Sequence, residues 1–141
     1  MSLSGGILIV DDSPLDAELI LQALIGNEVC SHAIHVREGA EALDFLYCQG
    51  HFTGRSSVQP ELVFLDLQMP GKDGMEVLRQ IRGDDRFKAM TVVMFTSAQD
   101  EIIATRAREL GVSLLIRKPV DYNEYVRLVK SAVGRVLNLP A

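Results

Sequence analysis

Several polar side chains in this sequence come directly after short apolar segments, and together they could support phosphoryl transfer. Asp11 and Asp12 follow ILIV, Asp66 follows LVFL, Thr96 follows VVMF, and Lys118 comes two residues after SLLI. Carboxylates are ligands for a hard cation, and an ammonium group pairs with phosphate. The repeated arrangement predicts one site that is assembled from several segments of the chain.

Asp11, Asp12 and Asp66 would repel one another if their carboxylates lay together. At about 4 Å and an effective dielectric constant near 20, each like-charged pair costs about 4 kcal/mol. A divalent cation removes this cost, and Mg²⁺ typically takes one or two carboxylates, several waters and a substrate phosphate. Lys118 would add a compact positive charge suited to phosphate. We therefore predict a Mg²⁺ site at this cluster.

Within such a site, one carboxylate can attack phosphorus and carry an acyl phosphate. Asp66 is the best candidate because it has no acidic neighbour in the sequence, whereas Asp11 and Asp12 form a pair suited to the metal. Thr96 could donate its hydroxyl to a phosphoryl oxygen. Each residue alone has an ordinary explanation as a cap, a turn residue or a surface lysine. Their shared position after apolar segments is what indicates function.

The elements that must position these residues alternate between two kinds. The short apolar segments, which we predict to be strands, are Ile7–Val10, Ala33–Val36, Leu62–Leu65, Thr91–Phe95 and Ser113–Ile116. Four of them are continuously apolar, which is typical of strands covered on both faces. The stretches between them show helical periodicity. Ser13 and Pro14 are helix start signals, Asp121 with Glu124 resembles a capping box, and Gly111 is placed to end a helix from about Gln99 to Leu110.

Five alternations of strand and helix predict an α/β fold with a doubly wound, five-stranded parallel sheet and helices on both faces. With right-handed crossovers and one reversal of winding, the arrangement is flavodoxin-like, with strand order 2-1-3-4-5. In such sheets, ligands bind outside the carboxyl ends of the strands at the point where the winding reverses. The acids, Thr96 and Lys118 would all lie at that edge.

Length and composition restrict the class of protein. The chain has 141 residues, 48% of them hydrophobic, which fits one domain. The net charge of -5 and the lack of a basic run argue against a nucleic acid or an anionic membrane as partner. No stretch approaches the ~20 apolar residues of a spanning helix. Cys30 and Cys48 are not spaced as a redox or zinc motif, which favours a cytoplasmic protein with reduced thiols.

Four motifs in order, ILIVDDS, LVFLDLQMPGKDG, VVMFTSA and LLIRKP, resemble the receiver domain of two-component response regulators over essentially the whole chain. The resemblance implies that Asp66 is the phospho-acceptor and that Asp11 and Asp12 hold Mg²⁺. It further implies that the backbone carbonyl of Gln68 is a metal ligand, that Thr96 is the switch hydroxyl and that Lys118 pairs with the phosphate.

The resemblance also implies a partner and a mode of action. The phosphoryl donor would be a phosphohistidine on a sensor histidine kinase. We expect residues 1–141 to form a single receiver domain with its core at 5–137 and no output domain, so that output comes from docking onto another protein, from homodimerisation or from phosphate relay. Catalysis would be limited to the protein's own phosphorylation and dephosphorylation. The long segment Cys48–Pro60 and the segment around Asp66 are similar to single-domain regulators paired with bacterial and cyanobacterial phytochromes.

Three further expectations concern single positions. Leu115 stands where receivers generally place a switching aromatic residue, so the usual coupling of Thr96 to an aromatic ring is in doubt. The Lys118–Pro119 bond is predicted to be cis, as is usual in the family. The histidines are expected to lie away from the acidic cluster; they are His32, His35 and His51.

Two rival functions remain at this stage. One is a Mg²⁺-dependent phosphatase or phosphotransferase that forms an aspartyl phosphate on external substrates, but Asp66-Leu67-Gln68 lacks the second acid of the D-x-D motif common in those enzymes. The other is a receiver fold kept only for protein interaction. Such forms usually lose one of the acids or the lysine, and this chain keeps all of them.

Overall fold

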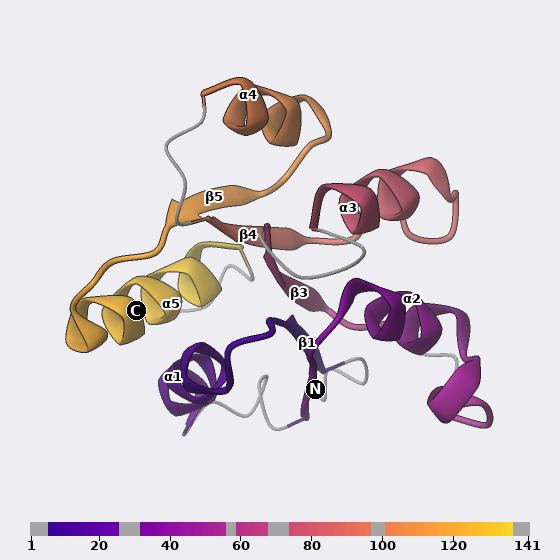
Figure 1. Ribbon diagram of the computed structural model, residues 1–141, viewed down its shortest axis with the longest axis horizontal. Coiled ribbons are helices and arrows are strands. Elements are labelled where there is room, and N and C mark those ends of the chain that lie inside the picture. Colours follow the sequence, from indigo (N-terminus) through magenta and orange to yellow (C-terminus); the bar gives the residue numbers. More distant parts are fainter. Residues whose placement is uncertain (1–5, 26–31, 56–58, 68–73, 97–100, 137–141) are drawn as a thin grey trace.

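The chain forms a parallel sheet with helices packed on its two faces (Figure 1). The computed structural model describes residues 6–25, 32–55, 59–67, 74–96 and 101–136. The elements are β1 (Ile7–Val10), α1 (Pro14–Leu24), β2 (Ala33–Val36), α2 (Gly39–Tyr47), the short 3-10 helix η2 (Gly50–Phe52), β3 (Leu62–Asp66), α3 (Gly74–Gly83), β4 (Val92–Thr96), α4 (Glu101–Glu109), β5 (Leu114–Arg117) and α5 (Tyr122–Val136).

The five strands are ordered β2-β1-β3-β4-β5 and all neighbours are parallel, which confirms the predicted fold. Strands β3, β4 and β5 each end one residue later than predicted. The reason is that the sheet pairing continues into the polar residues, with Asp66 opposite Phe95 and Thr96 opposite Arg117. The sheet itself therefore fixes the backbone of Asp66 and Thr96.

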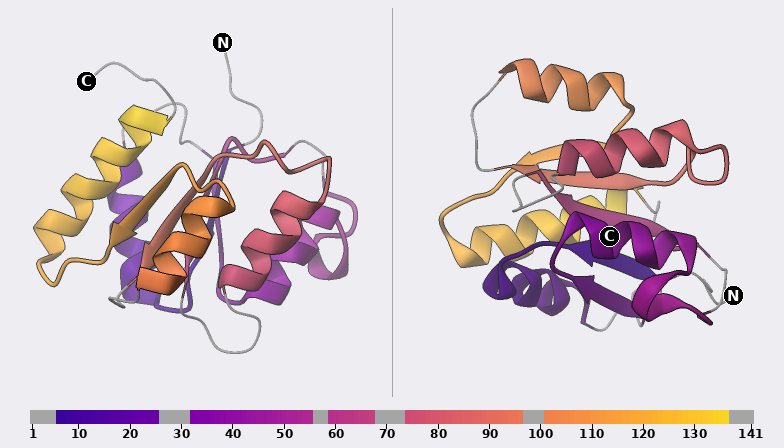
Figure 2. Two further views of the ribbon diagram at one scale, coloured as in Figure 1. Left: turned by 90° about the horizontal axis from the view of Figure 1, so that it is seen from above. Right: turned by 45° about the vertical axis from the view of Figure 1, so that its right-hand side comes forward.

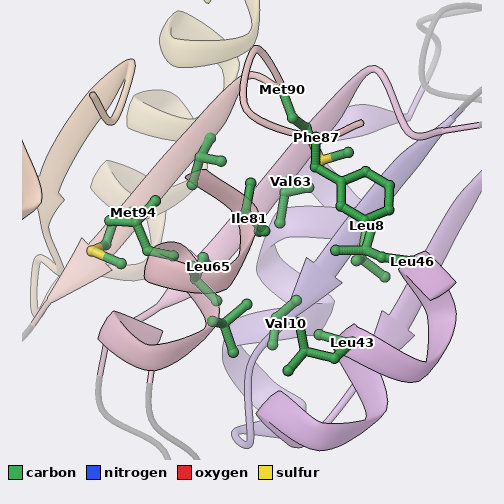
Figure 3. Packing of buried hydrophobic residues seen from close by; sticks show 14 of the residues in the cluster. Leu8, Val10, Leu43, Leu46, Val63, Leu65, Ile81, Phe87, Met90 and Met94 are labelled. Carbon is green, nitrogen blue, oxygen red and sulfur yellow. The ribbon is translucent and has the colours of Figure 1, made fainter. Parts of the chain in front are cut away.

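Successive side chains along each strand point to opposite faces of the sheet, which divides the hydrophobic core into two layers. Leu8 and Val10 face the side covered by α2 and α3, and Ile7 and Ile9 face the side covered by α1 and α5. Figure 2 shows these helix pairs on opposite sides of the sheet. Figure 3 shows the first layer, in which Leu43 from α2 and Ile81 from α3 meet side chains of the strands. Burial of each such side chain contributes about 1.5–3 kcal/mol.

The helix signals in the sequence correspond to real caps. The Ser13 hydroxyl accepts a hydrogen bond from the Asp16 N–H at 3.2 Å, and the Asp121 carboxylate accepts one from the Glu124 N–H at 3.0 Å. Gly111 has φ of 75°, a left-handed conformation that glycine adopts without strain, and it follows the end of α4. None of the described helices is both long and apolar enough to cross a membrane.

The peptide bond between Lys118 and Pro119 is trans, so the predicted cis bond is wrong; no described residue has a cis peptide. The trans form is the ordinary preference of an X–Pro bond by about 0.5–1 kcal/mol. The Lys118 backbone is held instead by a hydrogen bond from its N–H to the Thr96 carbonyl at 2.7 Å.

Candidate functional site: an acidic pocket at the carboxyl edge of the sheet

The structure brings the carboxylates of Asp11, Asp12 and Asp66 together at the ends of β1 and β3. One oxygen from each lies within 4.8 Å of the others. Asp11 and Asp66 are 1% and 4% exposed, and Asp12 is less buried. Three convergent carboxylate oxygens fit a hard divalent cation, because such cations prefer oxygen ligands and offset the mutual repulsion of the acids.

Lys118 reaches into this cluster from the segment after β5. Its Nζ donates to Asp16 Oδ2 at 2.6 Å and to Asp11 Oδ2 and Asp66 Oδ2 at 3.2 Å each. Burial by itself would lower the pKa of Lys118, but the hydrogen bond to Asp16 and the charges of Asp11 and Asp66 outweigh it and raise the pKa above 10.5. The side chain is 14% exposed, so this ammonium is a mostly buried charge balanced by carboxylates.

Burial is the largest influence on the pKa of Asp11. Burial raises its pKa above 3.8, while the Ser13 N–H and Lys118 act in the opposite direction. The Ser13 N–H donates to Asp11 Oδ1 at 2.9 Å, which fixes this carboxylate at the start of α1. A buried carboxylate that remains under-compensated is one that gains from a bound cation.

Thr96 ends β4 and is 8% exposed, next to Asp66 across the sheet. Its carbonyl accepts the Lys118 N–H, so the same residue supplies a hydroxyl to the edge of the sheet and anchors the lysine backbone. Gln68, predicted to offer its carbonyl to the metal, lies outside the described residues.

A glycine controls how closely the chain approaches Asp66. Gly74 begins α3, and a Cβ atom at this position would lie 2.3 Å from the Asp66 carbonyl oxygen. Any larger residue would force the start of α3 away from β3. The Gly74 N–H also donates to the Leu67 carbonyl at 3.0 Å, which ties the start of α3 to the residue after Asp66.

Sequence reasoning missed the role of two residues and misplaced a third. Asp16 was not predicted to belong to the site, although it is the nearest partner of Lys118. Tyr125 was not predicted to belong to the site, although it is 2% exposed and burial, together with the carboxylates of the pocket, raises the pKa of its phenol. His35 was expected to lie away from the cluster, but its Nε2 lies 2.7 Å from the Asp11 carbonyl oxygen. Because a carbonyl only accepts, Nε2 is the donor.

The correction for His35 has a simple cause. His35 lies on β2 opposite Ile9 of β1, two residues before Asp11. A long side chain on an edge strand therefore reaches the carboxyl end of its neighbour.

Leu115 is partly buried and packs on the layer formed with α2 and α3, so an apolar aliphatic side chain occupies the position where an aromatic residue is usual.

Comparison with known proteins gives a consistent picture. The model of the response regulator receiver domain matches residues 7–130. Response regulator Rcp1 of Synechocystis is 32% identical over 124 residues, which cover 88% of this chain and 83% of that protein. Its Mn²⁺-bound crystal structure superposes with a TM-score of 0.88 at 29% identity and covers 97% of both chains.

Two further solved structures are similar over nearly the whole chain. The phosphorylated cyanobacterial phytochrome response regulator RcpA has a TM-score of 0.88 at 31% identity, with 97% of this chain and 96% of that chain covered. The bacteriophytochrome response regulator AtBRR has a TM-score of 0.75 at 36% identity, with 97% and 94% covered.

Proposed function

Because the chain belongs to the response regulator receiver family, whose members are phospho-accepting signalling domains, we propose that Asp66 is the residue that accepts the phosphoryl group. The observation that supports this choice most directly is the position of its carboxylate. Asp66 ends the central strand β3, lies within 4.8 Å of Asp11 and Asp12, and is 3.2 Å from the Lys118 ammonium. Of the three acids, Asp66 is the one that lies within a strand, where it pairs with Phe95 of β4.

We propose that Asp11, Asp12 and Asp66, with the backbone carbonyl of Gln68, hold Mg²⁺. The carboxylate cluster and the Mn²⁺-bound structure of Rcp1 support a divalent cation at this place. When bound, Mg²⁺ supplies positive charge that offsets the negative charge of the phosphoryl oxygens.

The proposed reaction uses the residues around Asp66. An Asp66 carboxylate oxygen attacks phosphorus of a phosphohistidine on a sensor histidine kinase. The new O–P bond forms as the P–N bond breaks, and the imidazole nitrogen leaves with the electron pair. Lys118 pairs with a phosphoryl oxygen, and the Thr96 hydroxyl donates to another, which pulls this end of β4 toward the phosphoryl group.

We propose that the protein is a switch and not an enzyme for external substrates, and that it catalyses only its own phosphorylation and dephosphorylation. We infer that residues 1–141 form one receiver domain with its core at 5–137, and that it acts in the cytoplasm by docking onto a downstream protein or a second copy. The net charge of -5 supports a protein partner over a nucleic acid or an anionic membrane. The similarity to RcpA and AtBRR supports a phytochrome as the sensor kinase.

The phosphatase alternative is not favoured. Leu67 and Gln68 follow Asp66, so the second acid of a D-x-D motif is missing.

Phosphorylation with acetyl phosphate and Mg²⁺, followed by intact mass measurement, tests the assignment. Wild-type protein is expected to gain one phosphoryl group and Asp66→Asn none. Asp85→Asn is the matched control, because the Asp85 side chain is 94% exposed and forms an ion pair with Lys88, away from the acidic cluster. Equal uptake by Asp66→Asn and wild type would contradict the assignment, and sustained turnover of a phosphomonoester would revive the phosphatase reading.

A further inference from the structure

Lys118 is bound most closely by an acid that has no part in the proposed reaction. Its Nζ is 2.6 Å from Asp16 Oδ2, against 3.2 Å to Asp11 and 3.2 Å to Asp66. An ammonium group has three N–H donors. All three are used by the three carboxylates, so Lys118 has no donor left for a phosphoryl oxygen unless one carboxylate gives it up.

Asp16 is the carboxylate best placed to lose Lys118. It belongs to the first turn of α1 and is not in the group formed by Asp11, Asp12 and Asp66. Asp11 would share a bound cation, and Asp66 would carry the phosphoryl group. Asp16 would have neither, and Lys118 is its only cationic partner among the described residues. Its side chain is 22% exposed, so the released carboxylate would need a new donor.

Such a donor is present on the adjoining helix. The Tyr125 hydroxyl on α5 is buried and has no hydrogen-bond partner among the described residues. The ring stacks on Phe95 with centroids 5.4 Å apart, and Phe95 is the β4 residue that pairs with Asp66 and comes directly before Thr96. Helices α1 and α5 lie side by side on this face of the sheet (Figures 1 and 2). An unpaired buried hydroxyl is unfavourable, and a second state that satisfies it would be favoured.

The charges around Tyr125 point to the same neighbour. Burial is the largest cause that raises the pKa of the Tyr125 phenol, and the carboxylates of Asp16, Asp11 and Asp66 raise it further, with Asp16 first among them. The phenol therefore stays protonated at neutral pH and is available as a donor.

We propose that Asp16 and Tyr125 are positioning residues for Lys118: when a phosphoryl group is on Asp66, the Lys118 ammonium moves from Asp16 to the phosphoryl oxygens, and the Tyr125 hydroxyl donates to the Asp16 carboxylate in its place. This exchange rests on the proposed function of Asp66. It gives both the Lys118 ammonium and the Tyr125 hydroxyl an acceptor in the phosphorylated state. It also carries the change to α1 and α5, in a chain where Leu115 provides no aromatic ring for that purpose.

The test measures the affinity for beryllofluoride with Mg²⁺, a mimic of the phosphoryl group, in a double-mutant cycle. Tyr125→Phe is expected to weaken binding about tenfold, the size of one hydrogen bond to a charged group. Asp16→Ala removes the competing charge and is expected to tighten binding. In the Asp16→Ala background, Tyr125→Phe is expected to change affinity less than about twofold, since the side-chain acceptor is gone.

Matched controls lie on the same two helices. Tyr122→Phe removes the hydroxyl of a tyrosine that is 58% exposed on α5, and Glu18→Gln neutralises an exposed acid on α1. Neither is expected to change the affinity. A Tyr125→Phe effect that persists in the Asp16→Ala background, or no effect in wild type, would overturn the exchange. Weaker binding by Asp16→Ala would contradict the competition for Lys118.

Two readouts separate this role from a merely structural one. Without ligand, Tyr125→Phe should unfold at the same temperature as wild type or higher, because it removes an unpaired hydroxyl; a structural role for the hydroxyl predicts a lower temperature. The ¹³Cζ NMR signal of Tyr125 should shift on addition of beryllofluoride and Mg²⁺ in wild type but not in Asp16→Ala. If Asp66→Asn binds beryllofluoride as tightly as wild type, the proposed function is refuted. If wild type binds beryllofluoride but the effects of the Asp16 and Tyr125 substitutions are independent, only the exchange is refuted.

Discussion

The two ends of the sheet each hold a partly buried cation, but the cations have different partners. At the carboxyl edge, Lys118 donates to the carboxylates of Asp11, Asp16 and Asp66. Beyond the opposite edge, Arg82 at the end of α3 donates to backbone carbonyls. Its partners are Leu110 at 2.7 Å, Met90 and Gly111 at 2.8 Å each, and Lys88 at 3.1 Å.

The difference teaches what makes a buried cation structural or exchangeable. Carbonyls carry no net charge and belong to the backbone, so the contacts of Arg82 tie the end of α4 and the start of β4 to α3. Carboxylates carry charge that another cation can balance, so the contacts of Lys118 can be traded. We expect the Arg82 guanidinium to contribute mainly to stability and the Lys118 ammonium to contribute mainly to function.

Arg82→Ala should give the largest loss of stability. Four hydrogen bonds disappear and carbonyls at the C-terminal end of α4 lose their donor, so we expect the free energy of unfolding to fall by about 3 kcal/mol. Urea unfolding measures it, with Arg79→Ala, an exposed arginine less than one turn earlier in α3, as control. Phosphoryl uptake per folded molecule should not change. A loss below about 1 kcal/mol would mean that the hydrogen bonds of Arg82 do not stabilise the fold appreciably.

Lys118→Met should give a smaller loss that depends on Mg²⁺. Without the metal, three carboxylates lose their common cation, and we expect the free energy of unfolding to fall by about 2 kcal/mol. Mg²⁺ should recover most of this loss because it balances the same acids, whereas it should not rescue Arg82→Ala. Urea unfolding with Mg²⁺ and with a chelator tests the contrast, and Lys130→Met on the exposed face of α5 is the control. If Mg²⁺ recovers the stability of Arg82→Ala and Lys118→Met equally, the distinction between the two cations is wrong.

Alkaline pH should separate the two cations further. The pKa of Lys118 is raised above 10.5 in the folded protein, so the folded state holds this proton more tightly than the unfolded state. Its stabilising contribution is therefore fully present below pH 10.5 and is lost as the pH rises through the folded value. Burial lowers the pKa of Arg82 from 12.5, but a guanidinium stays charged over the pH range in which proteins are studied.

The measurement is the difference in unfolding free energy between wild type and each variant as a function of pH. The difference for Lys118→Met should shrink above pH 10.5, and the difference for Arg82→Ala should stay flat. A parallel decline of both differences would show that general alkaline unfolding, and not the Lys118 carboxylate cluster, sets the pH dependence.

The two ends also differ in how much of them the sequence predicts. The strands were predicted because short, continuously apolar runs that alternate with longer helical stretches are typical of parallel strands covered on both faces. Asp11, Asp66 and Lys118 were placed at one edge because parallel strands bring their carboxyl ends together. Arg82 gave no comparable signal, since its partners are backbone carbonyls in turns, and any residue type can supply a carbonyl.

The parts of the site that were missed have a related cause. Asp16 and Tyr125 lie on helices, and whether a helical side chain reaches the edge of the sheet depends on how α1 and α5 pack, which local patterns do not specify. His35 was misplaced because the reach of a side chain from an edge strand depends on register. The trans bond before Pro119 was missed because the expectation came from family resemblance and not from the residues themselves.

Ser13→Ala gives the smallest expected effect and the strictest test of the comparison, because Ser13 lies at the acidic edge but its hydroxyl binds a neutral partner. Its Oγ accepts the Asp16 N–H at 3.2 Å as the N-cap of α1. Loss of this cap should cost about 1 kcal/mol, and Ser13→Gly only a few tenths. If partner charge decides, urea unfolding should give the same loss with Mg²⁺ and with a chelator, as for Arg82→Ala. If Mg²⁺ restores the stability of Ser13→Ala, position at the acidic edge matters more than the charge of the partner.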